Sequence, residues 1–196
     1  MDAGRRALLI AGSAWLVPAA RAEAPAESLW PILRRGGSVI LIRHATTTEG
    51  AGDPPGYKLD DCATQRNLSE AGREEAKRIG ERIRAERVPI ARVYTSPWCR
   101  CRDTAMLAFG KSEDWAALSS VFDVPEKDRE YTERVKKRIG TYSSREMKGN
   151  VVMVTHNVNI ASLTKLSVAP GEMVVVRPDG CCGLRVVGRL LLVGRA

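Results

Sequence analysis

Aromatic residues are scarce in this sequence: Phe, Trp and Tyr together make up 5% of its 196 residues. Histidine is rarer still, with two copies. A core must therefore be built mainly from Val, Ile, Leu and Ala, and the 44% hydrophobic content is enough for one substantial core. No internal repeat and no domain linker is visible, so we expect one domain.

The sequence lacks the patterns typical of nucleic-acid-binding and zinc-binding proteins. Its net charge of +8 nevertheless suits an anionic partner. However, no block of basic residues with interleaved aromatics occurs, so nucleic acid is the weaker candidate and a phosphorylated small molecule the stronger one. Cys99 and Cys101 are poorly spaced for zinc when only two histidines exist elsewhere. We therefore expect no metal and no cofactor.

The first 22 residues have the layout of a secretory signal peptide. A basic start precedes an apolar stretch over 7–17, and small residues follow at Ala20 and Ala22. We expect cleavage after Ala22 and export of the domain 23–196 to the periplasm. The apolar stretch is too short to span a bilayer, so no stable membrane insertion is expected after cleavage. A buried N-terminal helix is the alternative.

Apolar runs of strand length alternate with helical patterns along the rest of the chain. Expected strands lie at 38–44, 91–96, 151–156, 172–178 and 183–193, and expected helices at 26–35, 67–88, 97–109, from 125 onward and at 159–166. Continuous apolar runs are typical of parallel strands buried on both faces. The order therefore predicts a three-layer α/β/α sandwich with a mostly parallel central sheet.

Two segments between these elements are informative. Ser69 is a good N-cap for the helix at 67–88, and its apolar residues recur at helical spacing. Residues 46–66 are rich in Gly, Pro and Asp and show no periodicity. Such a long loop within a compact domain is usually functional or disordered, so we expect it to contribute to specificity.

Both histidines follow apolar runs: His44 ends the first strand and His156 the third. A single histidine at a strand end is more often structural than catalytic. However, α/β sheets bind their ligands at the carboxyl ends of strands. Arg43 precedes His44, and Arg100 follows the end of the second strand. Guanidinium groups bind phosphate oxygens in pairs and a neutral imidazole can attack phosphorus, so we expect a phosphate site here.

These residues lie in four segments that resemble the histidine phosphatase (phosphoglycerate mutase-like) superfamily, in particular its exported bacterial members. The Arg43-His44-Ala45 triplet resembles the family's Arg-His-Gly. The segments "NLSEAGREEA", "SPWCRCRDTA" and "VTHNVNI" resemble its other motifs, in the same order. The resemblance implies a metal-independent phosphomonoesterase that works through a phosphohistidine intermediate on a small phosphorylated substrate, which could be a sugar phosphate.

The same resemblance implies roles for individual residues. His44 would become phosphorylated, and Arg43, Arg100 and His156 would hold the phosphoryl oxygens. Arg100 matches the family's phosphate-binding arginine, whereas Arg102 fits a solvated helix face. A non-catalytic phosphate-binding module of the same fold is the alternative function, and a redox or metal-binding cysteine protein is a distant third.

The proton donor departs from the family pattern. Where many members have a glutamate, this chain has Ser120, and where another branch has an aspartate it has Asn157. The remaining candidates are Glu172, at the start of a strand, and Asp123. We prefer Glu172, because Asp123 could simply cap the helix that follows. For either residue a plain surface carboxylate is the competing interpretation.

Export makes the five cysteines disulfide candidates, and an odd number leaves at least one unpaired within the chain. Cys181 and Cys182 are adjacent and cannot close an ordinary loop. We predict a bridge between Cys62 and Cys99, because Cys62 ends the loop that returns to the edge of the sheet where Cys99 lies. Cys101 is the alternative partner.

Overall fold

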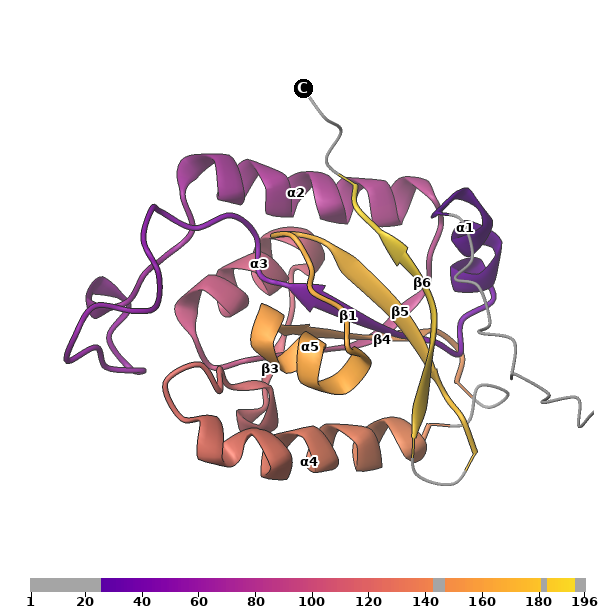
Figure 1. Cartoon of the computed structure of the whole chain (residues 1–196). Coiled ribbons are helices and arrows are strands. Elements are labelled where there is room, and N and C mark those ends of the chain that lie inside the picture. The colour runs from indigo at the N-terminus through magenta and orange to yellow at the C-terminus, as the bar shows by residue number, and fades with distance from the viewer. Residues whose placement is uncertain (1–25, 143–146, 181–182, 193–196) are drawn as a thin grey trace, which may run out of the picture.

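The computed structural model describes residues 26–142, 147–180 and 183–192. A six-stranded sheet forms its centre (Figure 1). The strands are β1 (Val39–Arg43), β2 (Ile90–Thr95), β3 (Glu113–Asp114), β4 (Asn150–Thr155), β5 (Met173–Pro178) and β6 (Leu184–Leu190), arranged in the order β3-β2-β4-β1-β5-β6. The signal predicted over 1–22 lies outside the described residues.

The sheet is mostly parallel, as predicted. β1 pairs in parallel with β4, β4 with β2, and β2 with β3, whereas β5 runs antiparallel to both β1 and β6. The side chains of β1 alternate between the two faces, and both faces are buried, which explains the continuous apolar run in its sequence. Only the short edge strand β3 was not predicted, because its two residues are exposed and acidic.

Helices cover both faces of the sheet and complete the predicted three layers (Figure 1). One face packs against α1 (Ala26–Arg34), α2 (Glu70–Ala85) and α3 (Cys99–Phe109), and the other against α4 (Asp128–Gly140) and α5 (Asn157–Thr164). The α2 helix begins as predicted, with the Ser69 hydroxyl accepting from Gly72 N at 3.1 Å. No helix within the described ranges is both long and apolar enough to cross a membrane.

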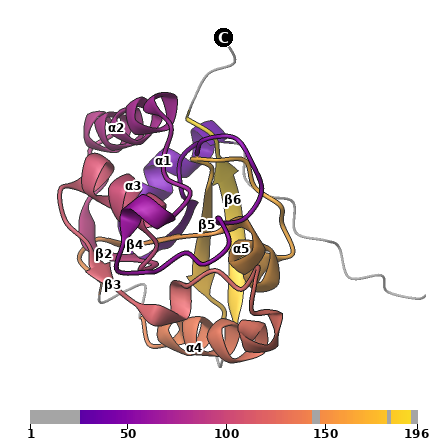
Figure 2. The same cartoon turned by 90° about the vertical axis from the view of Figure 1, so that its left-hand side faces the viewer.

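The loop at 46–66 crosses the end of the sheet where β1 terminates (Figures 1 and 2). It carries little regular structure apart from a 3₁₀ turn at Cys62–Thr64 and a bridge between Thr47 and Leu68. Hydrogen bonds nevertheless fix it: the Gln65 side chain donates to the carbonyl of Lys58 and accepts from Cys99 N at 3.0 Å. These hydrogen bonds hold the loop in place beside the carboxyl ends of the strands.

Candidate active site

A cleft of about 270 Å³ opens at the carboxyl ends of β1 and β4. His44 follows β1 and His156 follows β4, and because these strands are adjacent, His44 N donates to the Thr155 carbonyl at 3.0 Å. The two imidazole centroids lie 5.4 Å apart. The cleft is lined by Arg43, His44, Gly50, Ala51, Gly52, Asp53, Arg66, Arg100, Ser120, Phe122, Asp123, His156, Asn157 and Val158. Arg43, His44, Arg100 and His156 thus share one cavity.

The His44 imidazole is oriented and neutral. Its Nδ1 lies 2.8 Å from the Ala45 carbonyl oxygen, which can only accept, so Nδ1 carries the proton. The lone pair of the neutral ring is then on Nε2. Burial, aided by the charges of Arg100 and Arg43, lowers the pKa of His44 to about 3. At neutral pH the ring is therefore unprotonated at Nε2 and able to attack an electrophile.

His156 is held from the opposite side. Its Nε2 lies 2.9 Å from the Ser96 hydroxyl and 3.6 Å from the buried Cys101 thiol. Burial, together with the charges of His44 and Arg100, lowers the pKa of His156 well below its usual value. Because Nε2 is used by these contacts, Nδ1 is the nitrogen that can meet a ligand in the cleft.

Three arginines at the cleft share one arrangement. Each is fixed to the protein through Nη1: Arg43 to the Val168 carbonyl at 2.7 Å, Arg66 to the Gly50 carbonyl, and Arg100 to Asp53 Oδ1 at 2.7 Å. In each, Nε is buried without a hydrogen-bond partner. Buried donors without partners are costly, so the site is prepared for an anion that accepts these hydrogen bonds.

Asp53 is a site residue that sequence reasoning missed. Its carboxylate accepts from Arg100 Nη1, Trp98 Nε1 and Arg66 N, and the ion pair is almost fully buried, with side-chain exposures of 4% for Arg100 and 2% for Asp53. Burial alone would raise the pKa of Asp53, but the hydrogen bonds from Arg100 and Arg66 outweigh it and lower that pKa. Asp53 therefore stays ionised and orients Arg100.

Arg66 is the second residue that was missed. It lies at the end of the 46–66 loop, where no periodicity distinguishes it from a solvated arginine. Its charge contributes to lowering the pKa of Arg43, His44 and His156, so it acts on the same cavity as they do. The available signal was the unusual length of this loop, which indicated function but identified no residue.

The structure separates the two proton-donor candidates. Glu172 is buried away from the cleft lining, where its carboxylate accepts from Ala169 N at 2.8 Å and pairs with Arg189 at 2.6 Å. Asp123 lines the cleft and caps no helix, because α4 is preceded by a 3₁₀ turn whose N-cap is Val124. The geometry thus brings Asp123, and not the preferred Glu172, to the cleft that contains both histidines.

The two positions where the family resemblance predicts an acid, Ser120 and Asn157, carry neutral side chains. Both line the cleft. The Ser120 hydroxyl accepts from Phe122 N, and the side-chain Oδ1 of Asn157 accepts from Val168 N at 2.8 Å. Both side chains can hydrogen-bond a ligand, but neither can supply an acidic proton.

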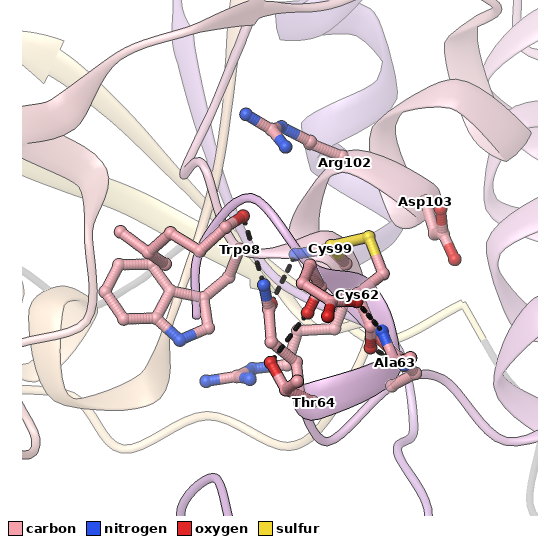
Figure 3. The surroundings of a disulfide bond; sticks show 12 residues. Cys62, Ala63, Thr64, Trp98, Cys99, Arg102 and Asp103 are labelled. Atoms are coloured by element: carbon pink, nitrogen blue, oxygen red, sulfur yellow. Dashed lines mark hydrogen bonds between the residues drawn. A yellow bond between two sulfur atoms is a disulfide. The ribbon is translucent and has the colours of Figure 1, made fainter. Parts of the chain in front are cut away.

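The predicted disulfide between Cys62 and Cys99 is confirmed, with the two Cα atoms 5.7 Å apart (Figure 3). It joins the 3₁₀ turn of the loop to the first residue of α3, one residue before Arg100. Cys101, the alternative partner, is buried and free. Cys181 and Cys182 lie outside the described residues. The bridge therefore attaches the 46–66 loop, which carries Asp53 and Arg66, to helix α3, which carries Arg100.

Removing this bridge should destabilise the protein. The disulfide joins residues 37 positions apart, for which the loop-entropy model gives about 3–4 kcal/mol. We expect the double variant Cys62→Ser/Cys99→Ser to lose about this much free energy of unfolding in a denaturant titration. Reducing agent should cause a similar loss in the native sequence and none in the variant. Equal stabilities of the oxidised protein and the variant would contradict a structural role for the bridge.

The residues at the cleft suit an anion better than a metal ion. Within the described residues, no three His, Cys, Asp or Glu side chains gather in a way that could hold a metal. Asp53, one of the two carboxylates that line the cleft, is already bound by Arg100 and Trp98. The positive charges that surround the cavity belong to guanidinium groups.

Comparisons with known proteins agree with this geometry. The family model described as histidine phosphatase superfamily (branch 1) matches residues 39–116. A search of curated proteins gives no match. Among solved structures, the protein histidine phosphatase SixA complexed with tungstate aligns with a TM-score of 0.52 at 16% identity, covering 79% of this chain and 97% of that one.

Two further structures share the fold. Phosphoserine phosphatase from Entamoeba histolytica, in complex with 3-phosphoglyceric acid, aligns with a TM-score of 0.55 at 12% identity, over 78% of this chain and 95% of that one. TTHB049 from Thermus thermophilus aligns with a TM-score of 0.52 at 18% identity, over 78% and 98%. The family-model match over residues 39–116 is thus to the histidine phosphatase superfamily, and these solved structures share the fold of this chain.

Proposed function

We propose that the protein is a metal-independent phosphomonoesterase that acts through a phosphohistidine on a small phosphorylated substrate. One observation carries this proposal: two neutral imidazoles and three arginines with partnerless Nε atoms surround one cleft. Phosphatases among the structures that share the fold support it. A sugar phosphate remains one candidate substrate.

The proposed reaction has two displacements. His44 Nε2 attacks phosphorus and forms a P–N bond while the bond to the ester oxygen breaks, and the departing oxygen takes a proton from the donor. Water then attacks the phosphohistidine while the deprotonated donor takes one of its protons. The P–N bond breaks, and inorganic phosphate, neutral His44 and the protonated donor result. Arg43, Arg100 and His156 stabilise the charge on the transferring group in both steps, because they are already oriented before the substrate arrives.

We propose Asp123 as the proton donor in preference to Glu172. Loss of an alkoxide requires a proton, whereas a phenolate leaves with far less help. We therefore expect Asp123→Asn to lose activity on alkyl phosphates by about 10²-fold or more while aryl phosphate hydrolysis largely survives. Steady-state kcat/KM on matched alkyl and aryl esters checks this. Glu172→Gln is the comparison, and a selective alkyl defect there instead would assign the role to Glu172.

A phosphatase screen of the purified protein, with EDTA present, tests the function as a whole. Turnover of phosphomonoesters under these conditions is the expected result. The second candidate, a phosphate-binding module without catalysis, is favoured by the absence of an acid at positions 120 and 157. Binding of inorganic phosphate without turnover of any ester would support that module and reject the enzyme.

We also propose that the protein is exported to the periplasm and that a leader ends at Ala22. The sequence of residues 1–22 and the bridge between Cys62 and Cys99 support this, because disulfides persist in oxidising compartments. Expression in a bacterial host, followed by cell fractionation and N-terminal sequencing, tests it. A periplasmic protein beginning at Glu23 is expected, whereas a cytoplasmic protein that retains residues 1–22 would contradict the proposal.

A further inference from the structure

The outer part of the cleft contains an exposed aromatic ring. Phe122 is 57% exposed, and of the four large hydrophobic side chains that the described residues expose, it is the one that lines the cleft. The other three are Leu59, Met106 and Leu191. Isolated exposed apolar residues are common on protein surfaces, but an aromatic ring beside a charged cleft has a more specific meaning.

The ring is supported on one side by the loop. A Cβ built at Gly52 would lie 3.5 Å from Cε1 of Phe122, so the ring packs over backbone that carries no side chain. Gly52 has φ of +70°, a conformation that favours glycine. More than half of the Phe122 surface is exposed to solvent. Phe122 is thus an apolar ring beside the loop backbone rather than a side chain covered by the core.

The position of Phe122 in the cleft indicates a contact with the leaving group of a substrate. The three arginines and the two histidines provide the polar part of the cleft, where a phosphoryl group would bind. Phe122 directly precedes Asp123, and Ala51 and Val158 add further apolar side chains to the lining. With Asp123 as the proposed proton donor, the ester oxygen of a bound phosphoryl group would lie on the side of Asp123. The atoms beyond that oxygen would lie next to the exposed ring.

We infer that Phe122 is a specificity-determining residue, and that the preferred substrates carry a planar ring close to the phosphoryl group, as phenyl and benzyl phosphates do. A planar ring can stack on Phe122 in an offset or edge-to-face arrangement and bury its apolar surface. A sugar hydroxyl placed there would lose water without gaining a hydrogen-bond partner from the ring. This inference rests on the proposed function for the location of the phosphoryl group.

Binding of non-hydrolysable phosphonates tests the inference without requiring turnover. Benzylphosphonate replaces the ester oxygen of phenyl phosphate by a methylene, and ethylphosphonate is its counterpart without the ring. We expect benzylphosphonate to bind the native protein about tenfold more tightly than ethylphosphonate in a calorimetric titration. Phe122→Leu keeps an apolar side chain but removes the ring, and should lose most of this preference. Inorganic phosphate should bind both proteins with similar Kd.

Two controls make the result specific. Met106→Ala removes an exposed apolar side chain outside the cleft and should leave the preference unchanged, and Phe122→Tyr should retain it. An unchanged preference in Phe122→Leu, or equal weakening of both phosphonates, would overturn the inference. If the preference behaves as expected but no ester is hydrolysed, the inference stands and the proposed catalysis fails. Hydrolysis without any preference for a ring would support the proposed catalysis and overturn the inference.

A kinetic panel of alkyl esters tests the substrate class, because all of its leaving groups are alkoxides. Benzyl phosphate should show a higher kcat/KM than glycerol 3-phosphate and glucose 6-phosphate in the native protein. This difference in kcat/KM should narrow by about fivefold or more in Phe122→Leu. A native protein that prefers the two esters without a planar ring would overturn the assignment of substrate class.

Discussion

Replacing His44 with alanine is expected to abolish phosphatase activity, lowering kcat by about 10⁴-fold or more. The variant has no imidazole at the position of the attacking Nε2, and the His156 ring is held by Ser96 with its centroid 5.4 Å from that of the native His44 ring. Steady-state kinetics on an aryl phosphate checks the loss. An aryl ester is the appropriate substrate because its departure depends least on the proton donor.

The control separates loss of the nucleophile from loss of the fold. His44 is buried, so alanine leaves a small cavity, whereas His44→Gln keeps most of the volume. Both variants should lose activity to a similar extent while binding inorganic phosphate through the arginines. A His44→Gln protein that is folded and turns over substrate at more than about one hundredth of the native rate would exclude His44 as the nucleophile.

Arg100→Ala is the second change with a large expected effect, and it acts on both stability and activity. Arg100 and Asp53 form a buried ion pair, and removal of one partner leaves the other charge buried without compensation. Such changes cost about 3–5 kcal/mol of folding free energy. We also expect a loss of at least about 2–3 kcal/mol of transition-state stabilisation in kcat/KM, because a charge-assisted donor is gone.

A second substitution distinguishes these two effects. Arg100→Ala/Asp53→Ala removes both charges, so it should recover much of the stability lost in Arg100→Ala but none of the activity. Denaturant titration and kcat/KM, measured on the same preparations, test this. If activity returned together with stability, Arg100 would be a structural residue and the phosphoryl group would be held elsewhere.

Arg102→Ala is the matched control on the same helix. Its guanidinium pairs with the exposed Asp114 and lies outside the cleft lining (Figure 3 shows its position near the disulfide). Exposed ion pairs contribute about 0–1 kcal/mol, so stability and kcat/KM should both remain close to native. A larger effect from Arg102 than from Arg100 would mean that the motif was aligned two residues out of register.

The sequence was sufficient for the fold and for the residues at strand ends. His44 and His156 follow continuous apolar runs, and adjacent parallel strands necessarily bring their carboxyl ends together. Arg100 follows the end of a neighbouring strand, but its choice over Arg102 rested on the resemblance of "SPWCRCRDTA" to the family motif. These positions depend on backbone topology, which periodicity and helix start signals determine well.

Residues whose role depends on tertiary contacts could not be predicted. Asp53 reaches Arg100 across 47 residues from a loop without periodicity, and nothing local distinguishes it from a turn aspartate. Glu172 illustrates the same limit: its sequence position indicated the correct edge of the sheet, but the direction of its carboxylate is decided by Arg189 on the neighbouring strand β6. The disulfide was predictable because both of its ends lie beside elements that topology had already placed.

The central claim is that catalysis proceeds through a phosphate covalently bound to His44, without a metal ion. The most direct measurement is a rapid acid-free quench of the protein with a ³²P-labelled aryl phosphate in the presence of EDTA, followed by peptide mapping. We predict label that is stable to base, labile to acid and located on the peptide containing His44. Turnover at the native rate with no label on that peptide, under conditions that preserve phosphohistidine, would contradict this claim.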